Sequence, residues 1–488
     1  MMANQGINVL PDELLCSILD FVHQRSESSN DLFNVLMVSR KFHNLVPDIL
    51  YRSPRLLKPK GTDVAGWHNR RAHQLHRLLS TLVEKPDLAK RIQHLDLTVV
   101  SDRPSGREWR DPNDIHEIDS SPYFYWPDYN EHRKILDISY ESAEIKRLDH
   151  LVKGWHYQVR TGFEPAIAGL ILALTPSLRH LAVQSYRISD EVLSHLVDAE
   201  SQEALKPPWL VADSIHPTDW FGESTYRGHP VPVGLSNLVS IKCNGLISWT
   251  IMRLPSLRSI GTGVSAARSA KPLESIRTHT YRTSISKVSH LALDLNCSPL
   301  HRVAGPRNSK DRIYLAWFTK YLCQLNILRI NFTGHLDMTS GADYSALLGR
   351  IYASGLRTLI LDTQNILRIR ENVSSGIVMP MLSLLQFPGL KRIVAPQEAL
   401  YQDGDERSCQ FPTSVEELEI LEPSETLNDC LAKIMDTGQH LEHLESILIW
   451  RAQNSDQPQT FHAPSAPVRD WMDENKIIFS QRKLTEEL

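Results

Sequence analysis

The stretch Leu356-Arg357-Thr358-Leu359-Ile360-Leu361 carries apolar residues at its first, fourth and sixth positions. From residue 238 onward, copies of this three-point pattern start between 19 residues (238 to 257) and 37 residues (288 to 325) apart. Repetition at a period of about 20–50 residues is typical of architectures built from stacked units. The copies begin at Ile92, Leu178, Leu238, Val288, Leu325, Leu356, Val415 and Leu444, and weaker copies begin at Leu257 and Leu390.

Most of these spacings can hold one strand and one helix. The helical apolar spacing between copies is found at residues 311–325, 344–353, 377–387 and 427–435. A strand–helix unit cannot bury its apolar face alone, so neighbouring units are expected to stack and share one core. The pattern resembles leucine-rich repeats. We therefore expect an α/β fold in the form of an irregular leucine-rich-repeat-like solenoid, or horseshoe, with some other α/β fold as the alternative.

In a horseshoe, strand alternation sends the leucines into the core and the residues between them to the concave side. The charges on that row are mixed with a slight acidic excess, which favours a peptide or protein ligand over a phosphate backbone. A solvated face is the alternative for each residue. The candidate target-binding residues on this row are Asp96, Lys242, Asp294, Arg329, Asp362, Glu419 and Trp450.

Two segments fit the repeat poorly. One insertion, at 101–147, is polar and acidic at first but contains Tyr123-Phe124-Tyr125-Trp126; the other, at 200–236, is proline-rich and contains Trp209 and Trp220. Their aromatic residues are expected either to anchor a partner or to fold back over the repeat. The sequence predicts four parts: an N-terminal unit at 1–55, a helical linker at 56–90, a repeat domain at 91–450 that contains both insertions, and a tail at 451–488. The tail begins as a linker and is expected to end either in a cap or in a segment that packs on the repeat.

The first fifty residues predict three short helices. Pro11 suits the first position of a helix, Asn30 or Asp31 can cap a second, and a third begins near Ser39. Pro47 is expected to interrupt the third helix and start a last short turn. So many apolar positions on so small a unit suggest that some of them face a partner. An ordinary helical lead-in to the main domain is the alternative.

These residues resemble an F-box, and the resemblance covers about a tenth of the chain. The matching stretches are Leu10-Pro11-Asp12-Glu13-Leu14-Leu15, Ile18-Leu19, Leu36-Met37-Val38-Ser39-Arg40-Lys41-Phe42 and Leu50-Tyr51-Arg52. The Leu-Tyr-Arg ending and the stretch from residue 82 to 97 are similar to F-box proteins of filamentous fungi. The resemblance implies docking on the Skp-type adaptor of a Skp–cullin–F-box ubiquitin ligase. The residues that would form or support the adaptor surface are Leu10, Pro11, Leu14, Leu15, Ile18, Leu19, Val38 and Phe42.

The sequence offers little that indicates catalysis. The string Gly261-Thr262-Gly263 imitates a dinucleotide-binding turn but lacks the acidic residue about 20 positions later, and it is expected to be a plain loop. His73 and His76 could share a helical face, yet Cys297 with His301 is the only other near-pair of zinc ligands. We expect no cofactor and no metal, and a protein that is not an enzyme.

Composition limits the cellular context. The 488 residues carry 53 basic and 57 acidic side chains, a net charge of −4 that argues against a general nucleic-acid coat. The longest apolar run, 166–174, is about half the length that a membrane span needs, and no signal region is evident. The six cysteines are dispersed, which fits a reducing compartment. We expect a cytoplasmic or nuclear protein that binds neither membrane nor nucleic acid.

Three functional hypotheses follow. The first is a substrate receptor of a ubiquitin ligase, with the adaptor and through it cullin on the N-terminal helices and an unknown protein target on the repeat. The second is a scaffold or interaction protein that acts outside a ligase. The third is an enzyme whose site lies in the tryptophan-rich insertions.

Overall fold

A computed structural model describes part of the chain, and every structural statement below concerns that part. It divides into two units, Met1–Leu257 and Arg258–Leu488, which are described separately. The described residues are 10–25, 30–56, 74–75, 77–100, 164–186, 233–243, 254–264, 286–296, 319, 322–336, 342–349, 351–368, 378–401, 409–437, 441–451 and 464–483. The first insertion and nearly all of the second lie outside these ranges, as do His73, His76, Cys297 and His301.

Both units contain helices and strands. The first unit contains α1 (Asp12–Arg25), α2 (Asn30–Leu36), α3 (Arg40–Arg52), β1 (Arg55–Leu56), α5 (Pro86–Ala89), β2 (His94–Val100), α9 (Glu164–Leu174), β3 (His180–Tyr186), α12 (Val233–Ser236) and β4 (Ser240–Cys243). The second contains β5 (Ser259–Val264), β6 (His290–Asn296), β7 (Ile327–Leu336), β8 (Ala342–Asp343), α15 (Tyr344–Leu348), β9 (Thr358–Arg368), β10 (Val378–Met379), β11 (Arg392–Pro396), α16 (Gln397–Leu400), β12 (Glu417–Leu421), α17 (Leu427–Thr437), β13 (Ser446–Arg451), α18 (Ala466–Glu474) and β14 (Ile478–Lys483).

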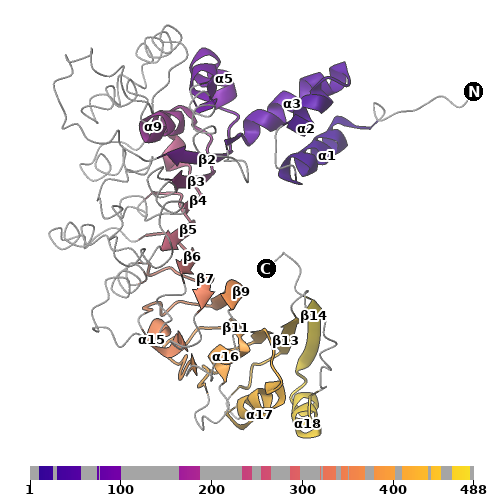
Figure 1. Cartoon of the computed structure of the whole chain (residues 1–488), viewed down its shortest axis with the longest axis vertical. Coiled ribbons are helices and arrows are strands. Elements are labelled where there is room, and N and C mark those ends of the chain that lie inside the picture. Colours follow the sequence, from indigo (N-terminus) through magenta and orange to yellow (C-terminus); the bar gives the residue numbers. More distant parts are fainter. Residues whose placement is uncertain are drawn as a thin grey trace, which may run out of the picture. The chain divides into compact units, whose positions relative to one another are not determined.

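The described strands pair in parallel, and strands that follow one another in the sequence are neighbours in space (Figure 1). The order is β1-β2-β3-β4 in the first unit and β5-β6-β7-β9-β11-β12-β13-β14 in the second, while β8 and β10 form a separate parallel pair. Helices α16, α17 and α18 contact one another in turn, and α16 also contacts β11. The predicted α/β class is confirmed.

Nearly all copies of the three-point pattern form the same local structure, the exception being Val288, whose amide donates to Oγ of Ser286 at 3.3 Å. The first apolar residue closes a turn, as when the Leu356 amide donates to the Ala353 carbonyl at 3.0 Å and the Leu390 amide donates to the Phe387 carbonyl, also at 3.0 Å. The other two apolar residues then point into the core from the strand that follows. All three leucines of the copy at 356 are completely buried. The weaker copies at Leu257 and Leu390 lead into β5 and β11 in the same way.

A second ladder of hydrogen bonds joins these turns. The Asn326 carbonyl accepts from the amides of Arg357 and Thr358 at 2.8 and 2.9 Å, and the Arg357 carbonyl accepts from Lys391 and Arg392 at 2.8 and 3.0 Å. The same double acceptance recurs in the first unit, where the Gln93 carbonyl accepts from Arg179 and His180. Such bonds join the copies at 92, 178 and 238 in the first unit and the copies from 257 to 444 leading into the second, because the carbonyl stands at the same pattern position each time.

The helices between the strands follow the sequence unevenly. The helix predicted at 427–435 is α17, and that at 344–353 is present but short, as α15. The helix predicted at 377–387 is wrong, because Val378–Met379 pairs with β8 as strand β10 and the Met381 amide donates to the Ala399 carbonyl. Most of 311–325 lies outside the described residues. The apolar run at 166–174 lies in α9, which packs against β2.

The end of the tail packs on the array, as one of its two alternatives predicted, whereas the glycine string differs from expectation. The end of the predicted tail forms α18 and β14, and β14 pairs with β13 from Ser446↔Ile478 to Arg451↔Lys483. Lys476 turns the chain between them with a left-handed φ of 57°. The predicted loop at Gly261-Thr262-Gly263 is wrong, because these residues lie within β5 and pair with β6.

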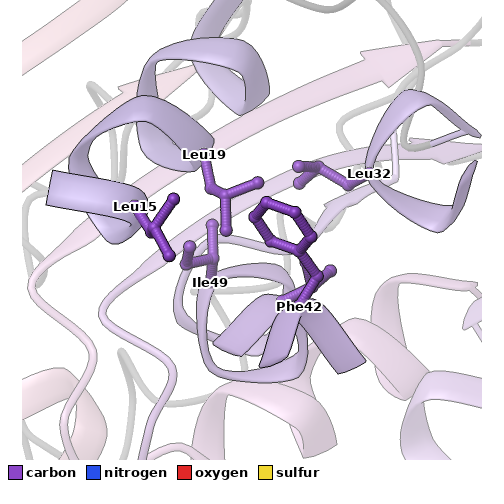
Figure 2. Packing of buried hydrophobic residues seen from close by; sticks show 6 residues of the cluster. Leu15, Leu19, Leu32, Phe42 and Ile49 are labelled. Carbon is purple, nitrogen blue, oxygen red and sulfur yellow. The ribbon is translucent and has the colours of Figure 1, made fainter. Parts of the chain in front are cut away.

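The first three helices pack around a small core of their own (Figure 2). The predicted helices are confirmed, and Ser39 caps α3 by accepting from the Phe42 amide at 3.3 Å. The predicted break at Pro47 is wrong, because α3 continues through it to Arg52 and loses only the bond that the missing proline N–H would make. The buried core residues are Leu15, Leu19, Leu32, Phe42, Val46 and Ile49.

We predict that Leu359→Ala lowers the free energy of unfolding by about 2–5 kcal/mol, because it opens a cavity in the shared core. Leu385→Ala is the matched control, since this leucine is exposed in the same unit and its truncation should change stability by about 0.5 kcal/mol or less. Urea unfolding followed by circular dichroism measures both. Equal effects would contradict the assignment of residue 359 to the core.

Candidate functional site

One face of α1 is apolar and exposed. Leu14, Ile18 and Phe21 have exposed fractions of 52%, 45% and 53%. Their spacing of four and then three residues places them on one stripe of the helix. Leu15 and Leu19, which lie next to them in the sequence, point instead into the core of the three helices. The helix is thus apolar on two sides, of which its own core covers one.

The turn between α2 and α3 adds two more exposed apolar side chains. Met37 is 86% exposed and Val38 is 69% exposed, the largest values among the exposed large hydrophobic residues of the described part. The amides of these residues donate to the carbonyls of Asn34 and Val35 at 3.2 and 3.0 Å, which tightens the end of α2. The backbone of the turn is therefore held by its own bonds while both side chains face outward.

Lys41 holds the start of α1 against α3. Its Nζ atom donates to the Leu10 carbonyl at 2.7 Å and lies 2.8 Å from Oδ1 of Asp12. The ion pair is largely exposed, so its contribution to stability is small, about 0–1 kcal/mol. Its effect is on position, because it fixes Pro11, which is exposed between the two contacts.

The structure divides the eight residues that the resemblance indicated. Pro11, Leu14, Ile18 and Val38 are exposed, whereas Leu15, Leu19 and Phe42 are buried and can only support the surface from beneath. Leu10 is partly buried against the same core. Sequence reasoning missed two exposed residues, Phe21 and Met37. The helical spacing from Leu14 could have indicated Phe21, whereas nothing in the local pattern indicates that Met37 faces outward.

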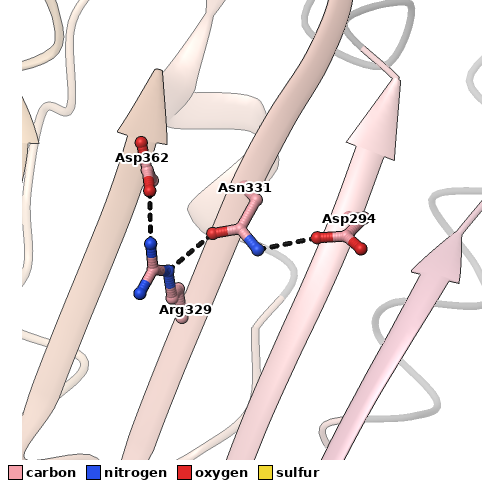
Figure 3. Close-up of polar contacts among 4 residues, drawn as sticks. All are labelled: Asp294, Arg329, Asn331 and Asp362. Carbon is pink, nitrogen blue, oxygen red and sulfur yellow. Dashed lines mark hydrogen bonds and ion pairs between the residues drawn. The ribbon is translucent and has the colours of Figure 1, made fainter. Parts of the chain in front are cut away.

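A chain of polar contacts crosses three strands of the second unit (Figure 3). Arg329 on β7 donates through one terminal nitrogen to Oδ2 of Asp362 on β9 at 2.5 Å, and through Nε to the Asn331 side-chain oxygen at 2.6 Å. The Asn331 amide in turn donates to Oδ1 of Asp294 on β6 at 2.6 Å. Asp362 is only 4% exposed, so the prediction of a solvated face is wrong at this residue.

A second cluster lies on β11, β12 and β13. Glu419 accepts from Nε of Arg392 at 2.7 Å through one oxygen, and from the Trp450 indole N–H at 2.6 Å through the other. Glu419 is 5% exposed, because its two partners cover it. The structure thus brings together two residues that the sequence predicted separately. Arg392 was missed, because it stands two residues before the row from which the candidates were taken.

The two remaining candidates, Asp96 and Lys242, lie in the first unit. Parallel pairing places Arg55, Asp96, Ala182 and Lys242 in one row across β1 to β4. Arg55 Nε lies 3.6 Å from Oδ2 of Asp96, and Lys242 is exposed. The candidate residues therefore do not form one site. Asp96 and Lys242 share a row in the first unit, and the other candidates form two clusters in the second.

Two of the described cysteines have thiols with shifted pKa values. Burial raises the pKa of the Cys409 and Cys430 thiols to about 12, with a smaller contribution from the Cys430 sulfur at Cys409 and from Asp429 at Cys430. Both thiols are protonated near neutral pH and are poor nucleophiles. Among the described residues, no group of three histidine, cysteine or acidic side chains is placed to hold a metal ion. Nor is any described helix long and apolar enough to span a bilayer.

No protein-family model matches the chain, and no curated protein matches it at a significant level.

We predict that Arg329 and Asp362 are energetically coupled. In a double-mutant cycle with Arg329→Met and Asp362→Leu, the coupling should be at least about 1 kcal/mol, because either single change leaves a polar group without its partner in a sparsely hydrated place. Lys90 with Asp87 is the control pair: both side chains are exposed and 2.8 Å apart, so Lys90→Met and Asp87→Leu should be nearly additive. Urea unfolding of the four variants of each pair measures both couplings. Additivity at Arg329 and Asp362 would contradict the network.

Proposed function

We propose that this protein is a substrate-recognition subunit of a Skp–cullin–F-box type ubiquitin ligase. In this proposal α1, α2 and α3 are an F-box that binds the Skp-type adaptor, and the parallel-strand region is an irregular leucine-rich-repeat-like solenoid that binds a target protein. The observation that carries the proposal is the exposed apolar surface formed by Leu14, Ile18, Phe21, Met37 and Val38, which we call the helix surface.

The helix surface is not accounted for by packing among the three helices. Their core consists of six buried residues with seven partly buried apolar residues packed against it, and none of the five exposed side chains is among these thirteen. Exposed apolar side chains that gather on one small unit, and are not scattered singly, are typical of a protein–protein interface. An adaptor that covers them removes apolar area from water, worth about 25 cal/mol per Å² before the cost of association.

The proposed solenoid rests on the strand order and on the repeated turn. Parallel strands that follow the order of the sequence, each preceded by the same turn, are what stacked repeats produce. The target surface would include the clusters around Asp362 and Glu419, where satisfied contacts hold polar and aromatic groups in place. Pre-organised groups of this kind lose little conformational entropy on binding.

The proposed mechanism is non-catalytic. The protein would hold a target near the charged conjugating enzyme and so raise the local concentration of its lysines. Such a subunit would act in the cytoplasm, the nucleus or both. It needs no cofactor of its own.

We predict that Leu14→Asp combined with Ile18→Asp abolishes co-purification with a Skp-type adaptor. Both side chains are exposed, so the fold should persist, while two charges would enter a desolvated apolar interface. Tyr352→Asp with Leu385→Asp is the matched control, because it places the same charges on exposed apolar positions of the second unit.

Pull-down with the adaptor and circular dichroism of each variant give the two readouts. Unchanged adaptor binding in the Leu14/Ile18 variant would overturn the proposal. Adaptor binding without cullin would instead indicate a scaffold that acts outside a ligase.

A further prediction concerns the target. Proximity labelling under proteasome inhibition should detect fewer target proteins with Trp450→Ala than with the wild type. The missing proteins should be ones that accumulate in the Leu14/Ile18 variant, because degradation of a target requires both target binding and adaptor binding. Labelling of the adaptor should be unaffected by Trp450→Ala. A target set that is identical in the wild type and in Trp450→Ala would place target recognition elsewhere.

A further inference from the structure

A cavity of about 320 Å³ opens across the strands of the first unit. Small-ligand pockets have volumes of about 300–1,000 Å³, and a water molecule occupies about 30 Å³, so the cavity has room for a group of several heavy atoms. It lies within a single unit, on strands held in register by backbone pairing. The side chains that matter to the argument are Arg55 on β1, His94 and Asp96 on β2, His180 on β3, and Ser240 and Lys242 on β4.

Two imidazole rings stack at this cavity. The ring centroids of His94 and His180 are 4.5 Å apart and the planes differ by 6°. Each ring is oriented by a hydroxyl group, with Nδ1 of His180 2.7 Å from Oγ of Ser240 and Nδ1 of His94 3.3 Å from Oγ of Ser53. Hydrogen bonds at Nδ1 leave Nε2 of each ring as the nitrogen with which a ligand can interact.

The fixed charges around the rings are mainly positive. Among the residues that the structure describes, Asp96 is the one acidic residue that lines the cavity, and it lies 3.6 Å from Arg55. Cationic side chains stand on every neighbouring segment: Arg52 at the end of α3, Arg55 on β1, Arg179 just before β3, and Lys242 on β4. The local charge therefore favours an anion.

We propose that this cavity binds the oxyanion end of a small ligand, a phosphoryl or carboxylate group, between the stacked imidazoles and Lys242. This site is separate from the helix surface, and it stands whether or not the protein joins a ligase.

Binding of an oxyanion in this cavity is expected to depend on pH. Burial, and then the neighbouring cationic groups, lower the pKa of both histidines, while Asp96 partly opposes this at His94. Both rings are therefore neutral at pH 7 and become protonated only below their ordinary pKa. A bound oxyanion offsets the repulsion between two stacked imidazolium rings and so raises both pKa values. By linkage, the anion binds more tightly as pH falls.

Sulfate and acetate are suitable probes, because sulfate is a tetrahedral dianion and acetate is a planar carboxylate, and both keep their charge between pH 6 and pH 8. The measurement is the Cε1–H signal of the histidines in the full-length protein by NMR, with His94→Gln and His180→Gln used to assign the two signals. Lys242→Gln tests the site without disturbing the stack, because Lys242 is exposed. Lys287→Gln, at an exposed lysine of the second unit, is the matched control.

We expect saturable shifts of both signals and a rise of about 0.5 in both pKa values, which corresponds to about threefold tighter binding for each ring that is protonated and about tenfold when both are. Lys242→Gln should weaken binding at least threefold, and Lys287→Gln should not. The stronger of the two probes identifies the head group. Shifts that fail to saturate, unchanged pKa values, or equal binding by Lys242→Gln would overturn the proposal. Adaptor pull-down by Lys242→Gln should equal wild type, which separates this result from the test of the helix surface.

Discussion

The structure depends on one repeated constraint. None of the described strands that follow a copy of the pattern can bury its apolar side chains and pair its backbone hydrogen-bonding groups by itself. Most of the described strands that follow a copy of the pattern bury two apolar side chains of that copy, and in most of them the preceding turn donates two amides to a carbonyl of the previous copy. Neither the apolar area nor the backbone groups are satisfied until a neighbour stacks on them. Order in one copy therefore requires order in the next.

This constraint also positions the polar groups. Because the register is the same from copy to copy, side chains line up in rows across the strands. Contacts between neighbouring rows then bring Arg329, which pairs with Ile360, to Asp362, and Arg392, which pairs with Glu417, to Glu419. Both carboxylates are buried, with exposed fractions of 4% for Asp362 and 5% for Glu419. In the first unit the same alignment stacks His94 on His180, although 86 residues separate them in the sequence.

The three N-terminal helices are stabilised differently from the strands. Their core is small and local, and they join the strands through the end of α3, where the Arg52 carbonyl accepts from the Gln93 amide at 2.9 Å. With a core of six residues, the helices cannot also bury Leu14, Ile18, Met37 and Val38. The helix surface is thus a consequence of how few apolar residues so small a unit can enclose.

The sequence alone determined the first three helices and the starts of the strands that follow a copy of the pattern, but not β1, β8, β10 or β14. The spacing of apolar residues indicates which face of a helix or strand is buried. That face is set by residues close together in the sequence, so the local pattern is enough to predict it. Even the weak copies at Leu257 and Leu390 were sufficient. Only the tertiary structure decided which apolar residues of α1 face outward, that residues 377–387 contain a short strand and no helix, and that Arg392 is the partner of Glu419. These features depend on contacts between residues distant in the sequence, and one local pattern is compatible with several such pairings.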